Sequence, residues 1–402
     1  SAYWGASSEQ IISGLYFSGW DNQSHFLPFA NTYEMQATTW STLDGTIAWN
    51  QWYPALHSTI WALAEQALNG AGASRVELLW PYVTWTAVSF VAAFAALAYV
   101  AGDLAGRLTP TYKSWARVLA VGAVGVFGLL GSPALLFNSG FTNFVMGIAV
   151  VATAVYLSAR SIKSARTLGW FLIPAAGLAA LGLWTPLVLA LVPAGVVVLV
   201  AVWRAPELAP RLRRIFAIAW AIGTSFAIVL TGMDQSQAIL GVDGDSTAAE
   251  FNQDIGRVGT GMIEFNIGLA LAAPLIAVFA AVLIRRRGLP MMLAIATPTL
   301  AVGLLAWIFS TGADANAVSR LQSYYVLKAL DGMLLTIAPI LAALAAAAIA
   351  RALATARLLS KVAATVVAAL VALTAFGYVG THPEQPWETF TAAPGVDAAF
   401  VR

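Results

Sequence analysis

The stretch 81–101, PYVTWTAVSFVAAFAALAYVA, runs for 21 residues without an Asp, Glu, Lys or Arg. A helix of about 20 apolar residues is long enough to cross the hydrocarbon core of a bilayer. The whole chain has the same character, because 59% of its residues are hydrophobic and 10% are charged, whereas soluble domains carry roughly 25% charged residues. The stretch therefore predicts a membrane-spanning helix, and the composition predicts further helices of the same kind.

Ten apolar stretches of this type can be distinguished along the chain. They lie at 81–101, 116–137, 141–158, 168–183, 185–203, 215–232, 264–284, 289–308, 326–350 and 362–380. The fourth and fifth are separated only by Trp184-Thr185-Pro186, where proline removes a backbone donor and disfavours helix in the residue before it. We therefore expect an all-α polytopic membrane protein of about ten transmembrane helices.

Basic residues occupy every second connection between these stretches. The basic connections contain Arg107, Lys113 and Arg117; Arg160, Lys163 and Arg166; Arg204, Arg211, Arg213 and Arg214; Arg285, Arg286 and Arg287; and Arg351, Arg357 and Lys361. Loops rich in Lys and Arg remain in the cytoplasm. The sequence thus predicts a multi-pass plasma-membrane protein with three parts: an external first segment (1–80), a transmembrane domain (81–380) and an external tail (381–402). An external start also predicts an eleventh span upstream of Ser1.

Composition also excludes several functions. The chain has no cysteine, which rules out disulfides and thiolate chemistry. The formal net charge of +2 carries no information on partners, because the basic residues lie in short loops and set the topology. Membrane lipids are expected partners, and nucleic acid is not implied.

The external segment 1–80 is crowded with aromatic and polar side chains, a mixture suited to the membrane interface. It predicts interfacial helices at 24–38, with Pro28 in the first turn, and at 53–69, with Pro54 near the start. Asp21 is a candidate general base toward a hydroxyl group, and it would lie one turn before His25 if the first helix extends that far. The alternative is an interfacial cap whose polar groups satisfy helix ends and lipid headgroups.

Two motifs of this segment, Gly19-Trp20-Asp21-Asn22-Gln23-Ser24-His25 and Trp52-Tyr53-Pro54-Ala55-Leu56-His57, resemble the membrane-embedded C-type glycosyltransferases, most closely the actinobacterial cell-envelope branch. The resemblance implies a polyprenyl-phosphate sugar donor, a cell-envelope glycan or glycolipid acceptor, and Asp21 as the base that deprotonates the acceptor hydroxyl. Many family members carry paired acidic residues here, whereas this chain has Asn22 after Asp21. The segment's candidate substrate-binding residues are Asn22, His25, Asp44, Tyr53 and His57. Asp44 also fits an ordinary Asp-Gly turn.

A second polar cluster, Ser323 to Asp331, lies where an external connection enters an apolar helix. Charges at that depth are costly unless they are paired or hydrated. Lys328 and Asp331 could pair on one helix face. In the functional interpretation, Arg320 and Lys328 bind the donor's lipid phosphate, and Tyr324 and Tyr325 contact the sugar or the prenyl chain. A departing phosphate gathers negative charge, which a nearby cation stabilises.

Metal and cofactor chemistry receive little support from the sequence. His25 and His57 with Asp21 and Asp44 could hold a divalent ion, but their spacing is not diagnostic, and the predicted reaction requires no cofactor. The connection 233–262 contains Asp243-Gly244-Asp245, yet the other ligand positions of a calcium loop are missing. We interpret that connection as a solvated acidic loop.

Three functions therefore compete. The first is a glycosyltransferase that acts on the external face. The second is a lipid or sugar transporter or flippase, which would place charges at the membrane midplane and break helices in corresponding halves. The third is a non-catalytic scaffold of envelope assembly, which no motif excludes.

Overall fold

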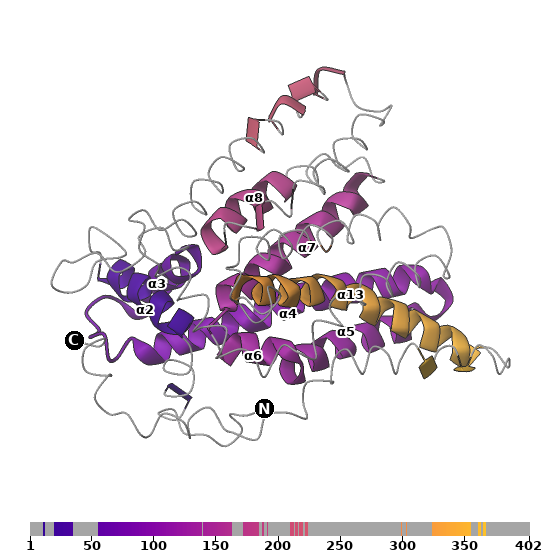
Figure 1. Ribbon diagram of the computed structural model, residues 1–402, viewed down its shortest axis with the longest axis horizontal. Coiled ribbons are helices and arrows are strands. Elements are labelled where there is room, and N and C mark those ends of the chain that lie inside the picture. Colours follow the sequence, from indigo (N-terminus) through magenta and orange to yellow (C-terminus); the bar gives the residue numbers. More distant parts are fainter. Residues whose placement is uncertain are drawn as a thin grey trace, which may run out of the picture.

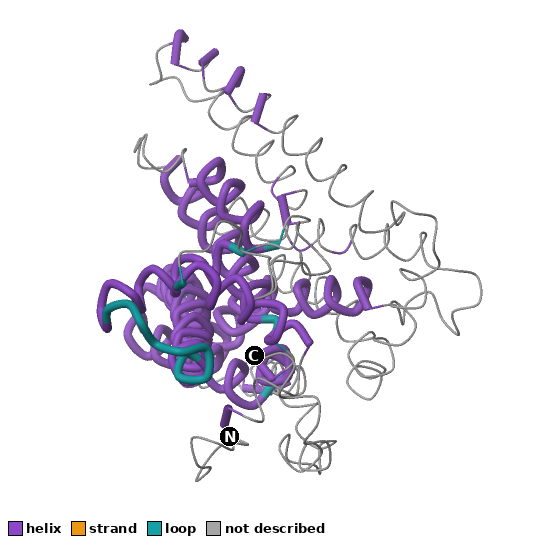
Figure 2. Tube along the Cα trace, turned by 90° about the vertical axis from the view of Figure 1, so that its left-hand side faces the viewer, coloured by secondary structure: helices purple, strands orange, loops and turns teal. Residues whose placement is uncertain are grey.

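The computed structural model describes about half of the chain. The described residues are 11–12, 20–34, 55–138, 140–162, 172–184, 187–188, 191, 210–212, 214–215, 217–219, 222–223, 299, 303, 324–354, 361–362 and 365–366. Within these ranges every regular element is a helix and no strand occurs (Figure 2). The predicted all-α class is confirmed for this part of the protein.

The helices are arranged as a bundle with a smaller helix pair at one end (Figure 1). They are α2 (Trp20–Tyr33), α3 (Leu56–Asn69), α4 (Leu79–Leu108), the short 3-10 helix η2 (Pro110–Tyr112), α5 (Lys113–Leu130), α6 (Ser132–Asn138), α7 (Thr142–Ile162), α8 (Leu172–Leu183) and α13 (Tyr324–Ala354). The helix α4 packs against α5, α7 and α13, while α8 lies along α7. Helices α2 and α3 pack on each other beside the start of α4.

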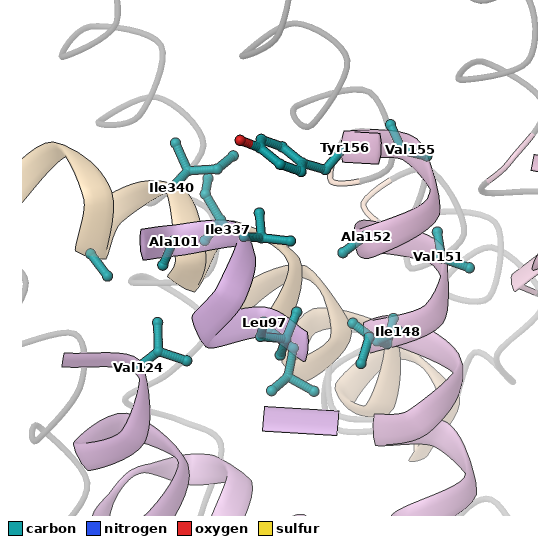
Figure 3. Packing of buried hydrophobic residues seen from close by; sticks show 14 of the residues in the cluster. Leu97, Ala101, Val124, Ile148, Val151, Ala152, Val155, Tyr156, Ile337 and Ile340 are labelled. Atoms are coloured by element: carbon teal, nitrogen blue, oxygen red, sulfur yellow. The ribbon is translucent and has the colours of Figure 1, made fainter. Parts of the chain in front are cut away.

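The centre of the bundle is apolar and closely packed (Figure 3). Leu97 of α4, Ile148 of α7 and Ile337 of α13 are all buried in a single cluster. Two glycines bring α4 and α5 together: a Cβ on Gly102 would lie 2.9 Å from the Val121 side chain, and one on Gly106 would lie 2.7 Å from the Arg117 side chain. Small residues four apart allow such close contact between membrane helices.

Two described helices, Leu79–Leu108 and Asp331–Ala354, are long and apolar enough to cross a membrane. The segments Thr142–Ser158 and Leu172–Leu183 are apolar but shorter. On the outside of α5, large apolar side chains are exposed, with Trp115 at 71%. These features are compatible with a membrane protein. The predicted spans at 185–203, 215–232, 264–284, 289–308 and 362–380 lie wholly or mostly outside the described residues.

One predicted span is wrong as a single helix. The expected span 116–137 is two helices, because α5 ends at Leu130 and α6 begins at Ser132. Gly131 between them is extended, with φ −94° and ψ −169°, and Pro133 cannot donate a backbone hydrogen bond that would continue the first helix. By contrast, the predicted break near Trp184 is confirmed, since α8 ends at Leu183.

Both helices that the sequence predicted in the first segment are present. α2 begins at Trp20, four residues earlier than expected, so Pro28 lies inside the helix and not in its first turn. α3 begins at Leu56, three residues later than predicted, and ends at Asn69 as predicted. Just before α4, the Arg75 guanidinium contacts the end of α2. It forms an ion pair with Glu34 at 2.8 Å and donates a hydrogen bond to the Asn31 side chain at 2.6 Å.

At the far end of the bundle, three arginines surround a single carboxylate. Asp103 of α4 lies 2.9 Å from Arg107, 3.4 Å from Arg117 of α5 and 3.3 Å from Arg160 of α7. It also accepts a hydrogen bond of 2.5 Å from the Tyr156 hydroxyl. We call these five residues the arginine cluster. It joins three helices whose basic connections the sequence predicted to share one side.

The long helix α13 also ends near the arginine cluster. The Arg351 guanidinium of α13 donates a 2.8 Å hydrogen bond to the Leu108 carbonyl, the last residue of α4. Carbonyls at a helix C-terminus have no partner within the helix and carry partial negative charge, so a guanidinium is a suitable cap. The C-terminal ends of α4, α7 and α13 therefore lie together, and their N-terminal ends point to the opposite end of the bundle.

Candidate functional site

A buried lysine lies among aromatic rings at the end of the bundle opposite the arginine cluster, where α7 and α13 begin. Lys328, in the second turn of α13, is 4% exposed. Its ammonium nitrogen is 4.2 Å from the ring centre of Phe141, 5.6 Å from Phe144 and 5.7 Å from Trp184. A cation over desolvated rings gains about 2 kcal/mol, whereas removing an ammonium from water costs several kcal/mol. The rings offset only part of this cost, so the position favours a negatively charged neighbour.

The suggested pairing of Lys328 with Asp331 is not found. Among the ion pairs between described residues, none joins these two side chains. Both lie on α13, three residues apart. The lysine instead extends toward three rings: Phe141 just before α7, Phe144 in the first turn of α7, and Trp184 just after α8. Lys328 and Asp331 therefore do not pair with each other.

His25 brings the first segment close to this lysine. It lies in α2, is fully buried, and has its pKa lowered from 6.5 to about 3, first by burial and then by the positive charge of Lys328. The Asn143 side chain beside it opposes that shift. The imidazole is therefore neutral. Its helix α2 and the lysine's helix α13 both approach the start of α7, where Asn143, Phe141 and Phe144 lie.

His57 of α3 lies against His25. The two rings meet edge to face with their centres 5.9 Å apart. Burial, and then the proximity of His25, lower the pKa of His57 from 6.5 to about 3. The neighbouring Ser58 hydroxyl donates a 2.7 Å hydrogen bond to the His25 carbonyl, which fixes α3 on α2. Two neutral histidines thus lie side by side at this end of the bundle.

Asn143, in the first turn of α7, completes the group. Its amide nitrogen donates a 2.8 Å hydrogen bond to the Leu183 carbonyl at the end of α8. That bond fixes which end of the amide is nitrogen. We call His25, His57, Asn143 and Lys328 the histidine cluster; it draws its members from α2, α3, α7 and α13.

The structure brings together His25, His57 and Lys328 of the ten predicted site residues. Asp21 lies in α2 one turn before His25, and Tyr324 and Tyr325 begin α13; the side chains of these three are outside the described part of the protein. Asn22 is buried and accepts a 3.3 Å hydrogen bond from the Tyr82 hydroxyl. Asp44, Tyr53 and Arg320 lie outside the described residues.

Sequence reasoning missed a second set of polar residues in this region. Ser89 of α4 contacts His57 and Trp61, at 3.1 Å and 2.5 Å. Glu65 of α3 is buried and accepts a 2.8 Å hydrogen bond from the Trp85 indole. Glu65 shares the buried face of α3 with His57 and Ser58, eight residues after His57, and that spacing was a usable signal. Ser89 gave none, because a lone serine in an apolar stretch is common.

The candidate metal ligands form no complete set in the described residues. No group of three or more histidine or acidic side chains there is arranged to hold an ion. A divalent ion held by His25 and His57 together with Asp21 or Asp44 stays a hypothesis.

Comparison with known proteins adds nothing to this geometry. No family model, no curated protein and no solved structure matches the chain. The function must therefore be argued from the residues themselves.

Proposed function

We propose that the protein is a membrane-embedded glycosyltransferase that uses a polyprenyl-phosphate sugar and acts at the end of the bundle that carries the histidine cluster. The observation that carries the proposal is that α2 and α13 both approach the start of α7, where Lys328 lies over Phe141 and Phe144 and the Asn143 side chain lies beside His25. The candidate base Asp21 lies on the first helix, and the candidate phosphate-binding lysine lies on the second. A transfer reaction needs these two groups in one chamber.

The surroundings of Lys328 suit a lipid phosphate. The ammonium is buried and held over three aromatic rings, and the helices α7 and α13 begin beside it. Helix N-termini present unpaired N–H groups and partial positive charge, which favour an anion. A phosphate bound there would accept charge-assisted hydrogen bonds from the ammonium, and the aromatic rings would remain in contact with the apolar chain of the same ligand.

The reaction would proceed by inversion at the anomeric carbon. Asp21 accepts the proton of the acceptor hydroxyl as its oxygen forms a bond to that carbon. The bond between the anomeric carbon and the phosphate oxygen breaks, and its electron pair leaves with the polyprenyl phosphate. Lys328 stabilises the negative charge that gathers on this leaving group. Protons and charge balance without a cofactor.

The decisive test is transfer by the Asp21→Asn variant, with the full chain in lipid nanodiscs supplied with polyprenyl-phosphate sugars and envelope-glycan acceptors. Loss of a general base costs about 10²- to 10⁴-fold, so we expect transfer to fall by that factor while donor binding persists. Asp243→Asn, in the acidic connection, is the matched control and should transfer at the wild-type rate. Undiminished transfer by Asp21→Asn would remove the proposed base.

Sidedness is a separate part of the proposal. We place the histidine cluster outside the cytoplasm because the arginine cluster terminates the predicted cytoplasmic connections. The chain has no cysteine, so Ala71→Cys and Thr111→Cys, both at exposed positions beyond opposite ends of α4, can each be labelled alone. An impermeant maleimide applied to intact cells should modify Ala71→Cys only. Equal labelling at both positions contradicts the orientation.

A buried lysine inside an apolar helix also favours the transport alternative, since ionisable groups within membranes often mark a substrate pathway. The two functions differ in product. If wild-type nanodiscs bind the donor and form no glycosidic product, while liposomes move the lipid-linked sugar between leaflets, the protein is a transporter.

A further inference from the structure

The Ser89 hydroxyl has three partners, and together they decide the state of His57. It lies 2.8 Å from the Trp85 carbonyl, 2.5 Å from the Trp61 indole nitrogen and 3.1 Å from the His57 Nε2. A hydroxyl group supplies one proton and two lone pairs. Three contacts can therefore be satisfied only when the hydroxyl donates to one partner and accepts from the other two.

The assignment of these roles follows from chemistry. The Trp61 indole can only donate, and the Trp85 carbonyl can only accept, so Ser89 donates its proton to that carbonyl, four residues earlier in the same helix. Its second lone pair then accepts a proton from His57 Nε2. The opposite assignment, with Ser89 donating to the histidine, would leave two oxygen atoms 2.8 Å apart with no proton between them.

The consequence is a fixed tautomer with an open acceptor. With the proton on Nε2, the other ring nitrogen of His57, Nδ1, carries a lone pair. That atom is buried and has no hydrogen-bond partner among the described residues. An unmet buried acceptor costs about 1–3 kcal/mol, and the histidine stays neutral because burial lowers its pKa to about 3. The lone pair is therefore present throughout the physiological pH range.

The neighbourhood decides which donor fits. A metal ion or an ammonium group would bring positive charge next to His25, where the charge of Lys328 already acts. A hydroxyl group donates a hydrogen bond without adding charge. The His57 ring lies against His25, and the charge of Lys328 also acts on His25, so we expect a ligand whose anionic part lies at Lys328 to reach His57 with its hydroxyl groups.

We propose that His57 is a tautomer-fixed hydrogen-bond acceptor that binds a hydroxyl group of the carbohydrate ligand through Nδ1. Ser89 and Trp61 are positioning residues, since they hold the proton on Nε2. The identification of the ligand as a carbohydrate rests on the proposed function; the tautomer does not. Sites built around one hydrogen bond reject analogues that lack the matching group, so His57 would also be a specificity determinant.

The tautomer can be read directly by nitrogen-15 NMR of histidine side chains. The chain contains only three histidines, and His25→Gln, His57→Gln and His382→Gln would each remove one set of signals and so assign them. In the full chain in nanodiscs we expect His57 to show a protonated Nε2 and an unprotonated Nδ1. A protonated Nδ1 overturns the proposal.

Two variants on the same face of α4 separate positioning from simple loss of a hydroxyl. Ser89→Ala removes the acceptor for Nε2 and should produce a mixture of tautomers. Thr86→Val removes a hydroxyl that is also buried, one turn earlier, and that has no hydrogen-bond partner among the described residues; it should leave the His57 signals unchanged. Identical spectra for Ser89→Ala and the wild type contradict the positioning role.

The ligand class is tested by titration with methyl pentosides and hexosides, and with the same compounds fully O-methylated. A free glycoside should move the His57 Nδ1 signal, its methylated form should not, and Ser89→Ala should bind about tenfold more weakly. A shift with Zn²⁺ and with no glycoside overturns the hydroxyl assignment. If glycosides bind at His57 while the protein transfers no sugar, the proposed function fails and this inference stands. If the protein transfers sugar while His57 Nδ1 is protonated, the proposed function stands and this inference fails.

Discussion

The two ends of the helix bundle treat charge in opposite ways. At the arginine cluster, one buried carboxylate is met by three guanidinium groups that remain 39–43% exposed, and by a tyrosine hydroxyl. At the histidine cluster, a lysine is buried against aromatic rings beside two neutral imidazoles. Along α4, about 21 Å separate Ser89, which contacts His57 of the histidine cluster, from Asp103, the centre of the arginine cluster.

This contrast indicates different purposes. The arginine cluster satisfies its acidic centre and keeps its cations partly hydrated, as expected of a device that holds helices together. In the histidine cluster, His57 Nδ1 and Asn143 Oδ1 have no hydrogen-bond partner among the described residues, which natural proteins tolerate chiefly at functional sites. Removing charge should therefore weaken the fold more at the first end than at the second.

The largest expected effect is at the arginine cluster. Asp103→Ala removes the acceptor shared by Arg107, Arg117, Arg160 and Tyr156, and leaves three like charges together. Because hydrogen bonds to charged groups each contribute about 1.5–3 kcal/mol and the arginines are partly hydrated, we expect a loss of about 3 kcal/mol in the free energy of unfolding. Denaturant unfolding in detergent measures it.

The matched control is Arg160→Gln, which removes one partly exposed partner and should cost under about 1 kcal/mol. Equal losses in the two variants would show that Asp103 does not organise this end of the bundle.

The second effect is a dependence of stability on pH. His25 and His57 have folded-state pKa values of about 3, below the ordinary 6.5, so the unfolded chain binds more protons between these values. Their contribution is complete above about pH 6.5 and is lost as the pH falls toward 3, at about 1.4 kcal/mol per pH unit for each histidine. Unfolding free energies at about pH 7.5 and 5.5 measure the slope.

The double variant His25→Gln with His57→Gln should flatten this dependence, whereas His382→Gln should not change it. A steep slope that survives in the double variant assigns the titration to other groups.

The third and smallest effect separates donor binding from folding. Lys328→Met keeps the length and apolar contacts of the side chain, removes the contacts of the ammonium with the rings, worth about 2 kcal/mol, and removes the cost of burying the ammonium. We expect the unfolding free energy to change by about 1 kcal/mol or less, while donor KM in the transfer assay rises at least tenfold. Melting temperature and donor titration in one preparation measure both; a destabilised variant with normal donor KM would assign Lys328 to the fold.

Local features of the fold could be predicted because they depend on neighbouring residues. The apolar run at 81–101 and the break at Trp184 follow from hydrophobic length and from proline, and both are observed. The helix predicted at 53–69 is observed at 56–69. The break at Gly131 was missed, since an apolar run continues across it and hydropathy does not register a single extended glycine. Asp103 was overlooked, although its spacing of four from Arg107 was visible.

The candidate site was only partly predictable. His25, His57 and Lys328 could be named because polar groups beside apolar helices are conspicuous. Their relation to one another, and the roles of Ser89 and Trp61, could not, because each contact joins residues that are tens or hundreds of positions apart in the chain.

The sequence by itself determined that this chain forms apolar helices and where its basic residues are concentrated, since helix length and charge are properties of short segments. Only the tertiary structure decided that Lys328 turns to aromatic rings and not to Asp331, that Asp103 gathers three arginines, and that one proton of Ser89 fixes the tautomer of His57. The reason is physical: burial and hydrogen-bond geometry depend on which helices meet, and no local pattern specifies that.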